Sequence, residues 1–334
     1  MPTPVAVLGA GSFGTCLAVQ AAQDHDVTIW ARDSDMATAI ERDRHNPKYL
    51  QDIELPPSIH ATADLAEALE GRELVICAIP SHGLRDVMSR AGKVMDPEAI
   101  LVSTVKGIEV ETGMLMHQVL ADVLAPEFHP RIAVLSGPSF AREVAEHKPT
   151  AVTLACRNEA YAISVQSALS CPWFRCYTHD DVIGVEVGGA LKNVIAIAVG
   201  MCDGLGLGLN ARAGLMTRGL REIGRLGEAL GANPLTFLGL SGMGDLVLTC
   251  TGHLSRNRTV GVQLGEGRTL DEIISNMNQV AEGVRTTHAV YDLATQLDVD
   301  MPIALGVRSV LTGEATVAEA SEQLMSRQLK SESE

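Results

Sequence analysis

The stretch that decides the fold is Val5-Ala6-Val7-Leu8-Gly9-Ala10-Gly11-Ser12-Phe13-Gly14, near the amino terminus. Its first four residues are apolar and predict a short buried strand, and the GxGxxG pattern after them predicts a tight turn into a helix over Phe13 to Ala22. A second apolar strand is predicted at Val27 to Trp30. Because these parts follow one another within about 30 residues, the segment is typical of a unit that binds a dinucleotide.

Each glycine of this turn has a separate role in such a unit. Gly9 permits the tight turn, Gly11 lets a pyrophosphate approach the backbone, and Gly14 lets helix and strand pack closely. The free N–H groups at the start of the helix face the phosphates. A turn of purely structural purpose is the alternative, but the flanking strand, helix and second strand favour the dinucleotide site.

The end of the second strand bears on which dinucleotide binds. Proteins that bind NAD usually carry Asp or Glu there, which accepts a hydrogen bond from the ribose 2'-hydroxyl. Here Ala31 and Arg32 follow the strand, and an arginine suits a 2'-phosphate. We therefore predict that NADPH is accepted and preferred over NADH. Asp33 leaves an alternative open, because a shift of one residue would place its carboxylate at the ribose.

The rest of the first half continues the alternation of strands and helices. Further strands are predicted at Leu74 to Ile79, Ile100 to Val105, Ile132 to Leu135, Ala151 to Ala155 and Trp173 to Cys176. After about residue 180 the pattern is helical only, with helices predicted near 182–202, 211–230, 255–265, 283–296, 301–311 and 315–328. We predict an α/β fold, with an N-terminal Rossmann domain built on a doubly wound sheet, residues 1–181, and an all-helical C-terminal domain, residues 182–334.

Composition and charge narrow the classes of function. The 334 residues carry a formal net charge of −15, which argues against nucleic acid or an anionic membrane surface as the main partner, because both need a basic field. A phosphorylated small molecule must then be held by local donors and a few placed cations. The seven cysteines include no CxxC pair, and no HExxH motif or Cys/His cluster occurs. We expect reduced thiols, no metal and a cytosolic protein.

Two segments bear on membrane association. The start, Met1-Pro2-Thr3-Pro4, leads straight into the first strand and lacks the basic and apolar regions of a signal segment. The apolar run Val187 to Asn210 is too short between its polar residues, and too rich in glycine, for a lipid-spanning helix, so we interpret it as buried. We expect a cytoplasmic protein without a membrane anchor.

Lys192 is a cation inside that apolar run. Gly188, Gly189 and Ala196 share its helical face, and their small side chains are expected to leave room beside it for a ligand. Desolvation disfavours the charged form of a lysine and lowers its pKa, which suits proton transfer. The alternative is a lysine that reaches the surface or pairs with a carboxylate.

Other candidate site residues follow strand ends, where ligands bind in open α/β sheets. Lys106 follows the strand that begins at Ile100, and Ser136-Gly137-Pro138-Ser139-Phe140-Ala141 follows Leu135. Gly137 allows close backbone approach and Ser139 can donate a hydrogen bond. For Lys106, a solvated loop lysine is the equal alternative.

Two segments of the helical half carry polar groups suited to a phosphate. Leu240 to Leu246 is predicted to be a flexible turn that presents the Asp245 carboxylate. Ser255 is a predicted N-cap, which places Arg256 and Asn257 in the first turn of a helix. Free backbone donors, a guanidinium and an amide at a helix start form an anion site, although an ordinary capped surface helix has the same residues.

Six motifs, in this order and spacing, resemble one family over nearly the whole chain. They are Gly9-Ala10-Gly11-Ser12-Phe13-Gly14, Lys106-Gly107, Ser136-Gly137-Pro138-Ser139, Gly189-Ala190-Leu191-Lys192-Asn193-Val194, Gly244-Asp245 and Ser255-Arg256-Asn257. The set resembles the bacterial NAD(P)-dependent glycerol-3-phosphate dehydrogenases. The resemblance implies reversible hydride transfer between C2 of sn-glycerol 3-phosphate and the nicotinamide of NADP(H) or NAD(H). Reduction of dihydroxyacetone phosphate would then feed phospholipid biosynthesis.

The resemblance also implies roles for the matching residues. Lys192 is implied to be the catalytic proton donor in reduction and acceptor in oxidation. The implied substrate-binding residues are Lys106, Gly137, Ser139, Lys192, Asp245, Ser255, Arg256 and Asn257. With the residues already named, the predicted cofactor-binding set is Gly9, Gly11, Ser12, Phe13, Gly14, Arg32, Lys106, Ala141, Arg256, Val280 and Glu282. Val280 and Glu282 enter because the segment Gln279 to Gly283 resembles the family's late cofactor-contacting loop.

Two other functions stay open at this point. One is another two-domain hydroxy-acid dehydrogenase, of the hydroxyisobutyrate or 6-phosphogluconate type, although that class usually separates its lysine and asparagine by a turn and here Lys192 and Asn193 are adjacent. The other is a dinucleotide sensor without turnover, against which Lys106, Lys192, Asp245 and Arg256 together speak. A helical second domain with exposed apolar faces also predicts a homodimer.

Overall fold

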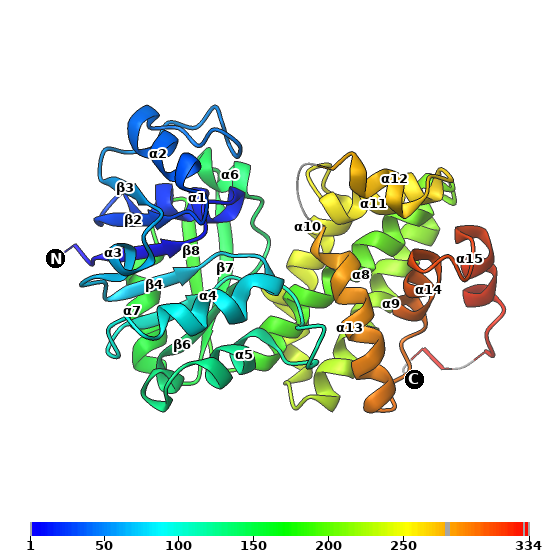
Figure 1. The fold of residues 1–334 in the computed structure, drawn as a ribbon. Helices are drawn as coiled ribbons and strands as arrows, with labels where there is room; N and C mark the ends of the chain where they lie inside the picture. Colours follow the sequence, from blue (N-terminus) through cyan, green and yellow to red (C-terminus); the bar gives the residue numbers. More distant parts are fainter. Residues whose placement is uncertain (1, 278–280, 330, 333–334) are drawn as a thin grey trace.

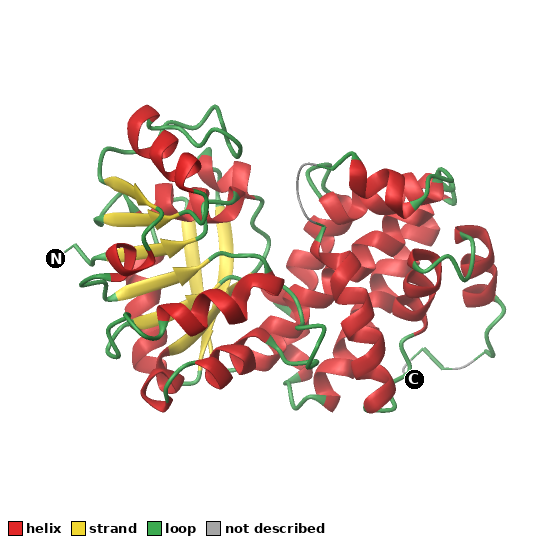
Figure 2. Cartoon of the chain, viewed as in Figure 1, coloured by secondary structure: helices red, strands yellow, loops and turns green. Residues whose placement is uncertain are grey.

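The computed structural model describes residues 2–277, 281–329 and 331–332. These residues form two halves that lie side by side, one built on a sheet and one of helices only (Figures 1 and 2). The last strand ends at His179 and the first helix of the second half begins at Val182, so a short connection joins the halves.

The first half is built on one sheet of eight strands. They are β1 (Val5–Leu8), β2 (Val27–Trp30), β3 (Ile59–Thr62), β4 (Leu74–Cys77), β5 (Ile100–Ser103), β6 (Ile132–Ser136), β7 (Thr150–Cys156) and β8 (Phe174–His179). Their order is β3-β2-β1-β4-β5-β6-β7-β8, and all neighbours are parallel except β6 and β7. The order reverses at β1, and this switch point is where such sheets bind a dinucleotide.

Helices cover the sheet on both faces, which explains why β1, β2 and β4 are fully buried apolar runs. The helices of this half are α1 (Ser12–Ala21), α2 (Ser34–Asp43), α3 (Leu65–Leu69), α4 (Leu84–Ala91), α5 (Met116–Val123), α6 (Ala141–Ala145) and α7 (Glu159–Leu169), with 3-10 turns η1 (Ser81–Gly83) and η2 (Pro126–Arg131). In Figure 1, α4 and α5 cross the near face of the sheet.

The second half packs around one long helix, α8 (Val182–Gly204), which is buried over nearly its whole length. Around it lie α9 (Gly208–Ala229), η3 (Pro234–Leu238), η4 (Leu240–Gly244), α10 (Asp245–Thr251), α11 (Arg256–Gly265), α12 (Leu270–Ser275), α13 (Glu282–Gln296), α14 (Pro302–Leu311) and α15 (Val317–Met325). Its side chains form one apolar core with those of α9, α10, α11, α13 and α14.

Two glycine pairs let α8 and α11 touch along their backbones. Gly200 and Gly204 of α8 face Gly261 and Gly265 of α11. A Cβ atom on Gly261 would lie 2.1 Å from the carbonyl oxygen of Ile197, and one on Gly200 would lie 2.2 Å from the carbonyl oxygen of Arg258. Glycine spaced by four on both helices therefore fixes how closely α11 approaches α8.

The predicted fold class is confirmed, with two differences in detail. Strand β3 was not predicted, because His60 and the small residues beside it lack an apolar run. Residues 240–246 are not a flexible turn: a single π-helical turn, η4, leads directly into α10. Leu246 and Cys250 of α10 are buried four residues apart, and this spacing anchors the segment as a helix.

The interpretation of the apolar run as a buried helix is confirmed, but the argument from its length was wrong. The structure makes α8 continuous over 23 residues, which by length and composition alone is enough to cross a membrane. Of its most apolar window, 94% is buried inside the protein. This burial matches a core helix that is covered by other helices.

Candidate active site

Lys192 lies in the middle of α8 and is almost inaccessible, with 8% of its side chain exposed. Its Nζ donates a hydrogen bond to Oδ1 of Asp245 over 2.5 Å and to Oγ1 of Thr249 over 2.9 Å. Both partners come from α10, one helical turn apart. The alternative of a lysine that reaches the surface is therefore excluded, and the pairing with a carboxylate is present.

Lys106 reaches the same carboxylate from the other half of the protein. It follows β5, and its Nζ donates to Oδ2 of Asp245 over 2.7 Å and to the carbonyl oxygen of Gly137 over 3.3 Å. Asp245 is 1% exposed, and each of its two carboxylate oxygens pairs with one lysine. Two cations share one buried anion at the junction of the halves.

The charges at this junction shift two pKa values. Burial lowers the pKa of Lys192 to about 8; Asp245 opposes this shift and the positive charge of Lys106 adds to it. Burial by itself would raise the pKa of Asp245, but Lys106 and Lys192 outweigh it, so its pKa stays below the usual value. At neutral pH the arrangement keeps a carboxylate ionised beside an amine that can gain or lose a proton.

The small neighbours of Lys192 do not leave an open space, contrary to the expectation. A Cβ atom on Gly188 would lie 2.5 Å from the carbonyl oxygen of Ser241, and one on Gly189 would lie 2.6 Å from Oγ of Ser136. These glycines let η4 and the end of β6 pack directly on α8. Their role is close packing of protein against protein.

The start of α11 has the predicted local geometry. Ser255 is its N-cap, and its Oγ accepts from the N–H of Arg258 over 3.3 Å, so Arg256 and Asn257 occupy the first turn of the helix as predicted. The Asn257 side chain points inward: its Nδ2 donates to Asn193 over 2.9 Å, and its Oδ1 accepts from the N–H of Gly283 over 3.0 Å. Because its side-chain amide is bonded within the protein, Asn257 would contact a ligand through its backbone N–H.

Arg256 is the first residue of α11. Burial among surrounding atoms lowers the pKa of its guanidinium, and the charges of Glu282 and Tyr49 oppose that shift. Tyr49 belongs to the sheet half and Glu282 begins α13. Arg256 therefore lies where groups of both halves approach it.

The glycine-rich turn fits a dinucleotide. Gly9 has a φ of +116°, and a Cβ atom there would lie 2.6 Å from the carbonyl oxygen of Ala78. A Cβ atom on Gly14 would lie 1.8 Å from the carbonyl oxygen of Gly9, whereas one on Gly11 meets nothing within 4 Å. Two glycines allow close packing and the third faces open space, as the three roles in the motif require. Ser12 begins α1.

The two candidate residues after β2, Arg32 and Asp33, differ in whether their side chains are already bound. Arg32 is exposed at the end of β2. The Asp33 carboxylate caps α2, since its Oδ1 accepts from the N–H groups of Asp35 and Met36 over 2.9 and 3.4 Å. The Phe13 ring lies 6.0 Å from Nζ of Lys106, so the first turn of α1 adjoins the lysine pair.

The remaining predicted residues lie around the same junction. Oγ of Ser139 donates to the carbonyl oxygen of Gly137 over 2.9 Å, and Ala141 begins α6. The Glu282 carboxylate accepts from Oγ of Ser81 over 2.6 Å and so links α13 to η1. Val280 lies outside the described residues.

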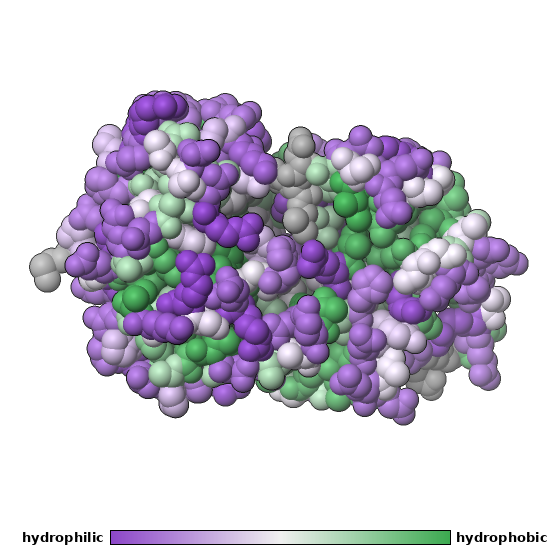
Figure 3. Space-filling model, viewed as in Figure 1, coloured by the Kyte–Doolittle hydropathy of each residue, from purple (hydrophilic) through white to green (hydrophobic). Residues whose placement is uncertain are grey.

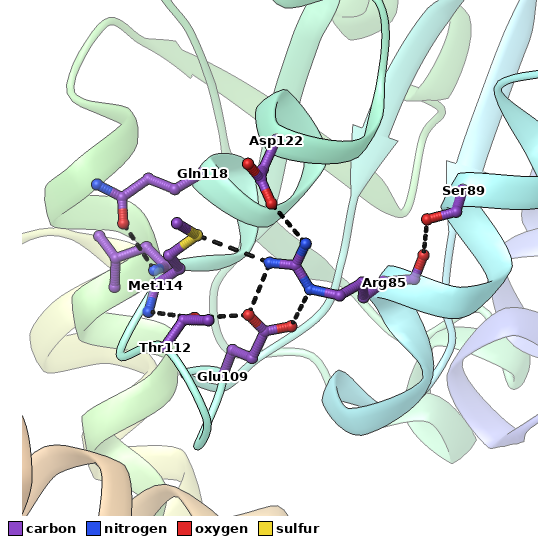
Figure 4. A network of polar contacts seen from close by, with 8 residues as sticks. Arg85, Ser89, Glu109, Thr112, Met114, Gln118 and Asp122 are labelled. Carbon is purple, nitrogen blue, oxygen red and sulfur yellow. Dashed lines mark hydrogen bonds and ion pairs between the residues drawn. The ribbon is translucent and has the colours of Figure 1, made fainter.

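Sequence reasoning missed a network that holds the loop of Lys106. Figure 4 shows the Arg85 guanidinium between Glu109 and Asp122, with Thr112 and Met114 beside them. Arg85 of α4 donates to both Glu109 oxygens over 2.9 and 2.8 Å and to Asp122 of α5 over 2.5 Å. Glu109 follows Lys106 by three residues, so this network ties that loop to two helices.

Thr249 was also missed, although its spacing was a signal. It lies four residues after Asp245, and on a helix these two side chains share a face. The expectation of a flexible turn hid that relation. Among the described residues, no three His, Cys, Asp or Glu side chains gather as metal ligands would.

Comparison with known proteins shows similarity along nearly the whole chain. The family model for the N-terminus of NAD-dependent glycerol-3-phosphate dehydrogenase matches residues 4–162, and the model for its C-terminus matches residues 181–322. A protein of Citrifermentans bemidjiense named glycerol-3-phosphate dehydrogenase [NAD(P)+] is 51% identical over 99% of both chains. One of Myxococcus xanthus with the same name is 50% identical over 98% of both.

A solved structure agrees with these sequences. The crystal structure of glycerol-3-phosphate dehydrogenase from Coxiella burnetii matches with a TM-score of 0.93 and 39% identity, and covers 98% of this chain and 99% of that one. The similarity therefore extends over both halves and the junction between them.

Proposed function

The chain belongs to the NAD-dependent glycerol-3-phosphate dehydrogenase family, and from this premise we propose that Lys192, Asp245 and Lys106 form its catalytic centre. The protein is an oxidoreductase that interconverts sn-glycerol 3-phosphate and dihydroxyacetone phosphate with NAD(P). One observation carries the assignment of the centre: a single buried carboxylate binds two lysines, one from each half.

Lys192 moves the proton of the reaction. In oxidation its neutral amine accepts the proton of the C2 hydroxyl, and in reduction its ammonium group returns a proton to the same oxygen. A bound nicotinamide supplies the hydride acceptor or donor. Asp245 holds Lys192 in place, and the positive charge of Lys106 stabilises negative charge that develops on the C2 oxygen.

The start of α11 is proposed to bind the phosphate of the substrate. The positive end of the α11 dipole and the charge of the Arg256 guanidinium, which lies in the first turn of this helix, both favour an anion there. Ser255 shapes this helix start through its cap, and Gly137 and Ser139 line the substrate side at the end of β6. These contacts supply the positive field that the acidic chain as a whole lacks.

The cofactor is proposed to lie along the carboxyl edge of the sheet. Gly9, Gly11, Ser12, Phe13 and Gly14 would hold its pyrophosphate, and Ala141, Lys106, Arg256, Val280 and Glu282 its nicotinamide side. Arg32 is proposed to bind a 2'-phosphate and so to favour NADPH, because Asp33 is already used as a helix cap. Residues 1–181 would form the cofactor domain and 182–334 the substrate domain.

A direct assay tests this function. Purified protein, NADPH and dihydroxyacetone phosphate are mixed, and the loss of nicotinamide absorbance is followed. We expect oxidation of NADPH that depends on dihydroxyacetone phosphate, and no such oxidation with methylmalonate semialdehyde, the aldehyde that corresponds to 3-hydroxyisobutyrate. A protein that binds NADPH but oxidises none with dihydroxyacetone phosphate would contradict the function and favour a dinucleotide sensor.

We further propose that the protein is a cytoplasmic homodimer that supplies sn-glycerol 3-phosphate to phospholipid biosynthesis. Its seven cysteines are all free thiols, which suits a reducing compartment. Apolar side chains reach the surface in both halves on the face drawn in Figure 3, and exposed ones occur close together in sequence at Leu235, Leu238, Met243, Val247 and Leu254. Sedimentation equilibrium would test the dimer, which a monomer mass would contradict.

A further inference from the structure

Asn46 is a fully buried residue between α2 and β3 whose amide makes four hydrogen bonds. Its Nδ2 donates to the carbonyl oxygen of Ala10 and to Oγ1 of Thr15, each over 2.9 Å. Its Oδ1 accepts from the N–H groups of Lys48 and Tyr49 over 3.0 and 2.9 Å. A side-chain amide has two N–H donors and an oxygen with two lone pairs, so every position of Asn46 is used.

The bond to Ala10 acts on the glycine-rich turn. The Ala10 carbonyl belongs to the peptide group that joins Ala10 to Gly11, and a trans peptide is planar, with its C=O and N–H pointing in opposite directions. The described residues contain no cis peptide. Because Asn46 holds the carbonyl on one side, the N–H of Gly11 must point to the other side.

The backbone at Gly11 has room beside it for a ligand. Gly11 is the N-cap residue of α1, and a Cβ atom built on it meets no other atom within 4 Å. The N–H groups around a helix start of this type bind pyrophosphate. Asn46 thus fixes the orientation of a peptide group at a helix start that has space for a dinucleotide phosphate.

We propose that Asn46 is a positioning residue for the cofactor, which orients the Gly11 N–H toward the pyrophosphate through the Ala10–Gly11 peptide. The bond to Thr15, in the first turns of α1, fixes the amide relative to that helix. The proposal rests on the function proposed above, because it needs a bound dinucleotide. Asn46 lies outside the six motifs that carry the family resemblance.

The Asn46 amide also joins the glycine-rich turn to the loop from Asn46 to Asp52, which faces the helical half. The loop starts at Asn46, which binds its first two N–H groups, and Arg142 of α6 holds its far end through two bonds to Asp52 of 2.7 and 3.0 Å. Tyr49 in this loop is near enough to Arg256 to affect its pKa. The loop is fixed at both ends, so displacement of Asn46 would disturb the cofactor side of the junction.

Asn46→Asp tests the proposal with little change of shape. The variant keeps an oxygen that accepts from Lys48 and Tyr49 and loses the donors to Ala10 and Thr15. We expect the Kd of NADPH, followed by its fluorescence at about pH 8, to rise about tenfold or more. The reason is that the Gly11 N–H would no longer be held toward the pyrophosphate, and a hydrogen bond to a charged group contributes that much. At saturating NADPH, kcat and the KM of dihydroxyacetone phosphate should stay within about twofold of the wild type.

A pH profile separates positioning from a general loss of structure. A protonated carboxyl donates a hydrogen bond. The ratio of the variant Kd to the wild-type Kd should therefore shrink as the pH falls from about 8 to about 5.5. The matched control is Asn158→Asp, since Asn158 caps α7 through an oxygen that the variant keeps, and the Kd of NADPH should not change.

Asp52→Asn provides a second test at the exposed end of the loop. It should raise the Kd of NADPH about two- to fivefold, as expected for loss of a partly exposed ion pair. This measurement remains possible if Asn46→Asp does not fold. A folded Asn46→Asp with the wild-type Kd, or an unchanged Kd for Asp52→Asn when the first variant does not fold, would overturn the proposal. A wild type that binds NADPH without oxidising it would instead contradict the proposed function.

Discussion

At the residue scale, the proposed catalytic centre depends on the balance of three charges. Asp245 lies between two lysines, and the pKa of Lys192 falls to about 8 because burial and Lys106 outweigh the attraction of the carboxylate. A lysine fully protonated at neutral pH could donate a proton but not accept one. In the proposed mechanism, the shifted pKa would let the same side chain serve both directions of the reaction.

Lys192→Ala should therefore remove the proton transfer and little else. We expect kcat to fall by roughly 10² to 10⁴, the usual contribution of a general acid or base, while the Kd of NADPH stays nearly unchanged. In the wild type, oxidation of sn-glycerol 3-phosphate should speed up as the pH rises through about 8, because the neutral amine is the acceptor. The control is Lys93→Ala, an exposed lysine after α4. Unchanged turnover in Lys192→Ala would remove this residue from the mechanism.

The choice between NADPH and NADH also belongs to single residues. Arg32→Ala should lower kcat/KM for NADPH roughly ten- to a hundredfold, because a hydrogen bond to a charged group contributes about 1.5–3 kcal/mol, and should leave NADH nearly unaffected. Initial rates with both cofactors measure the ratio. Asp33→Asn serves as the control because it can keep the oxygen that caps α2. A wild type with a strong preference for NADH would contradict the assignment of Arg32.

At the element scale, the crossing of α8 and α11 would set the distance between the two ends of the proposed substrate site. Lys192 lies on α8, and the proposed phosphate site is the first turn of α11. The four glycines between these helices allow backbone contact, which any side chain would widen. If the site is placed as proposed, the packing of these two helices determines the length of substrate that can span it.

Gly261→Ala tests this role of the glycines. Its Cβ atom would lie 2.1 Å from the carbonyl oxygen of Ile197, so α11 must move away from α8. We expect a loss of about 1–3 kcal/mol in the free energy of unfolding, typical of overpacking, and a higher KM for dihydroxyacetone phosphate with an unchanged Kd for NADPH. Urea unfolding and steady-state kinetics measure both.

Gly224→Ala on α9 is the matched control, because a Cβ atom there meets nothing within 4 Å. It should stabilise the helix by about 0.4–1 kcal/mol and leave the KM unchanged. An unchanged KM in a folded Gly261→Ala would show that the crossing does not set the phosphate distance.

At the scale of the whole molecule, the sequence predicted the order of elements well and the contacts between distant elements poorly. Apolar runs and glycine punctuation are local signals, so most strands and the long helices were predicted within a few residues. The network around Arg85 joins residues up to 37 positions apart, and nothing in the local sequence shows that they meet. The prediction of open space beside Lys192 was wrong for the same reason, because Ser136 and Ser241 fill that space from remote segments.

Stability of the whole molecule should depend on pH through Glu222, a buried carboxylate of α9 that the reaction does not use. It accepts from the N–H groups of Ile303 and Ala304 at the start of α14 over 2.7 and 3.2 Å. Burial raises the pKa of Glu222 from 4.5 to about 7, and the two backbone bonds oppose that shift. The unfolded chain therefore loses this proton at a lower pH than the folded protein.

The sign of the effect follows from that difference. Stability from the raised pKa is fully present below about pH 4.5 and is lost as the pH rises through about 7, by up to about 3 kcal/mol at 1.36 kcal/mol per pKa unit. Glu222→Gln cannot ionise and keeps an oxygen that accepts at α14, so wild type should lose stability relative to this variant between pH 5 and about 8. Urea unfolding followed by circular dichroism at both pH values measures the difference, with Glu228→Gln, exposed on the same helix, as the control. If wild type and Glu222→Gln respond to pH in parallel, ionisation of Glu222 is not coupled to folding.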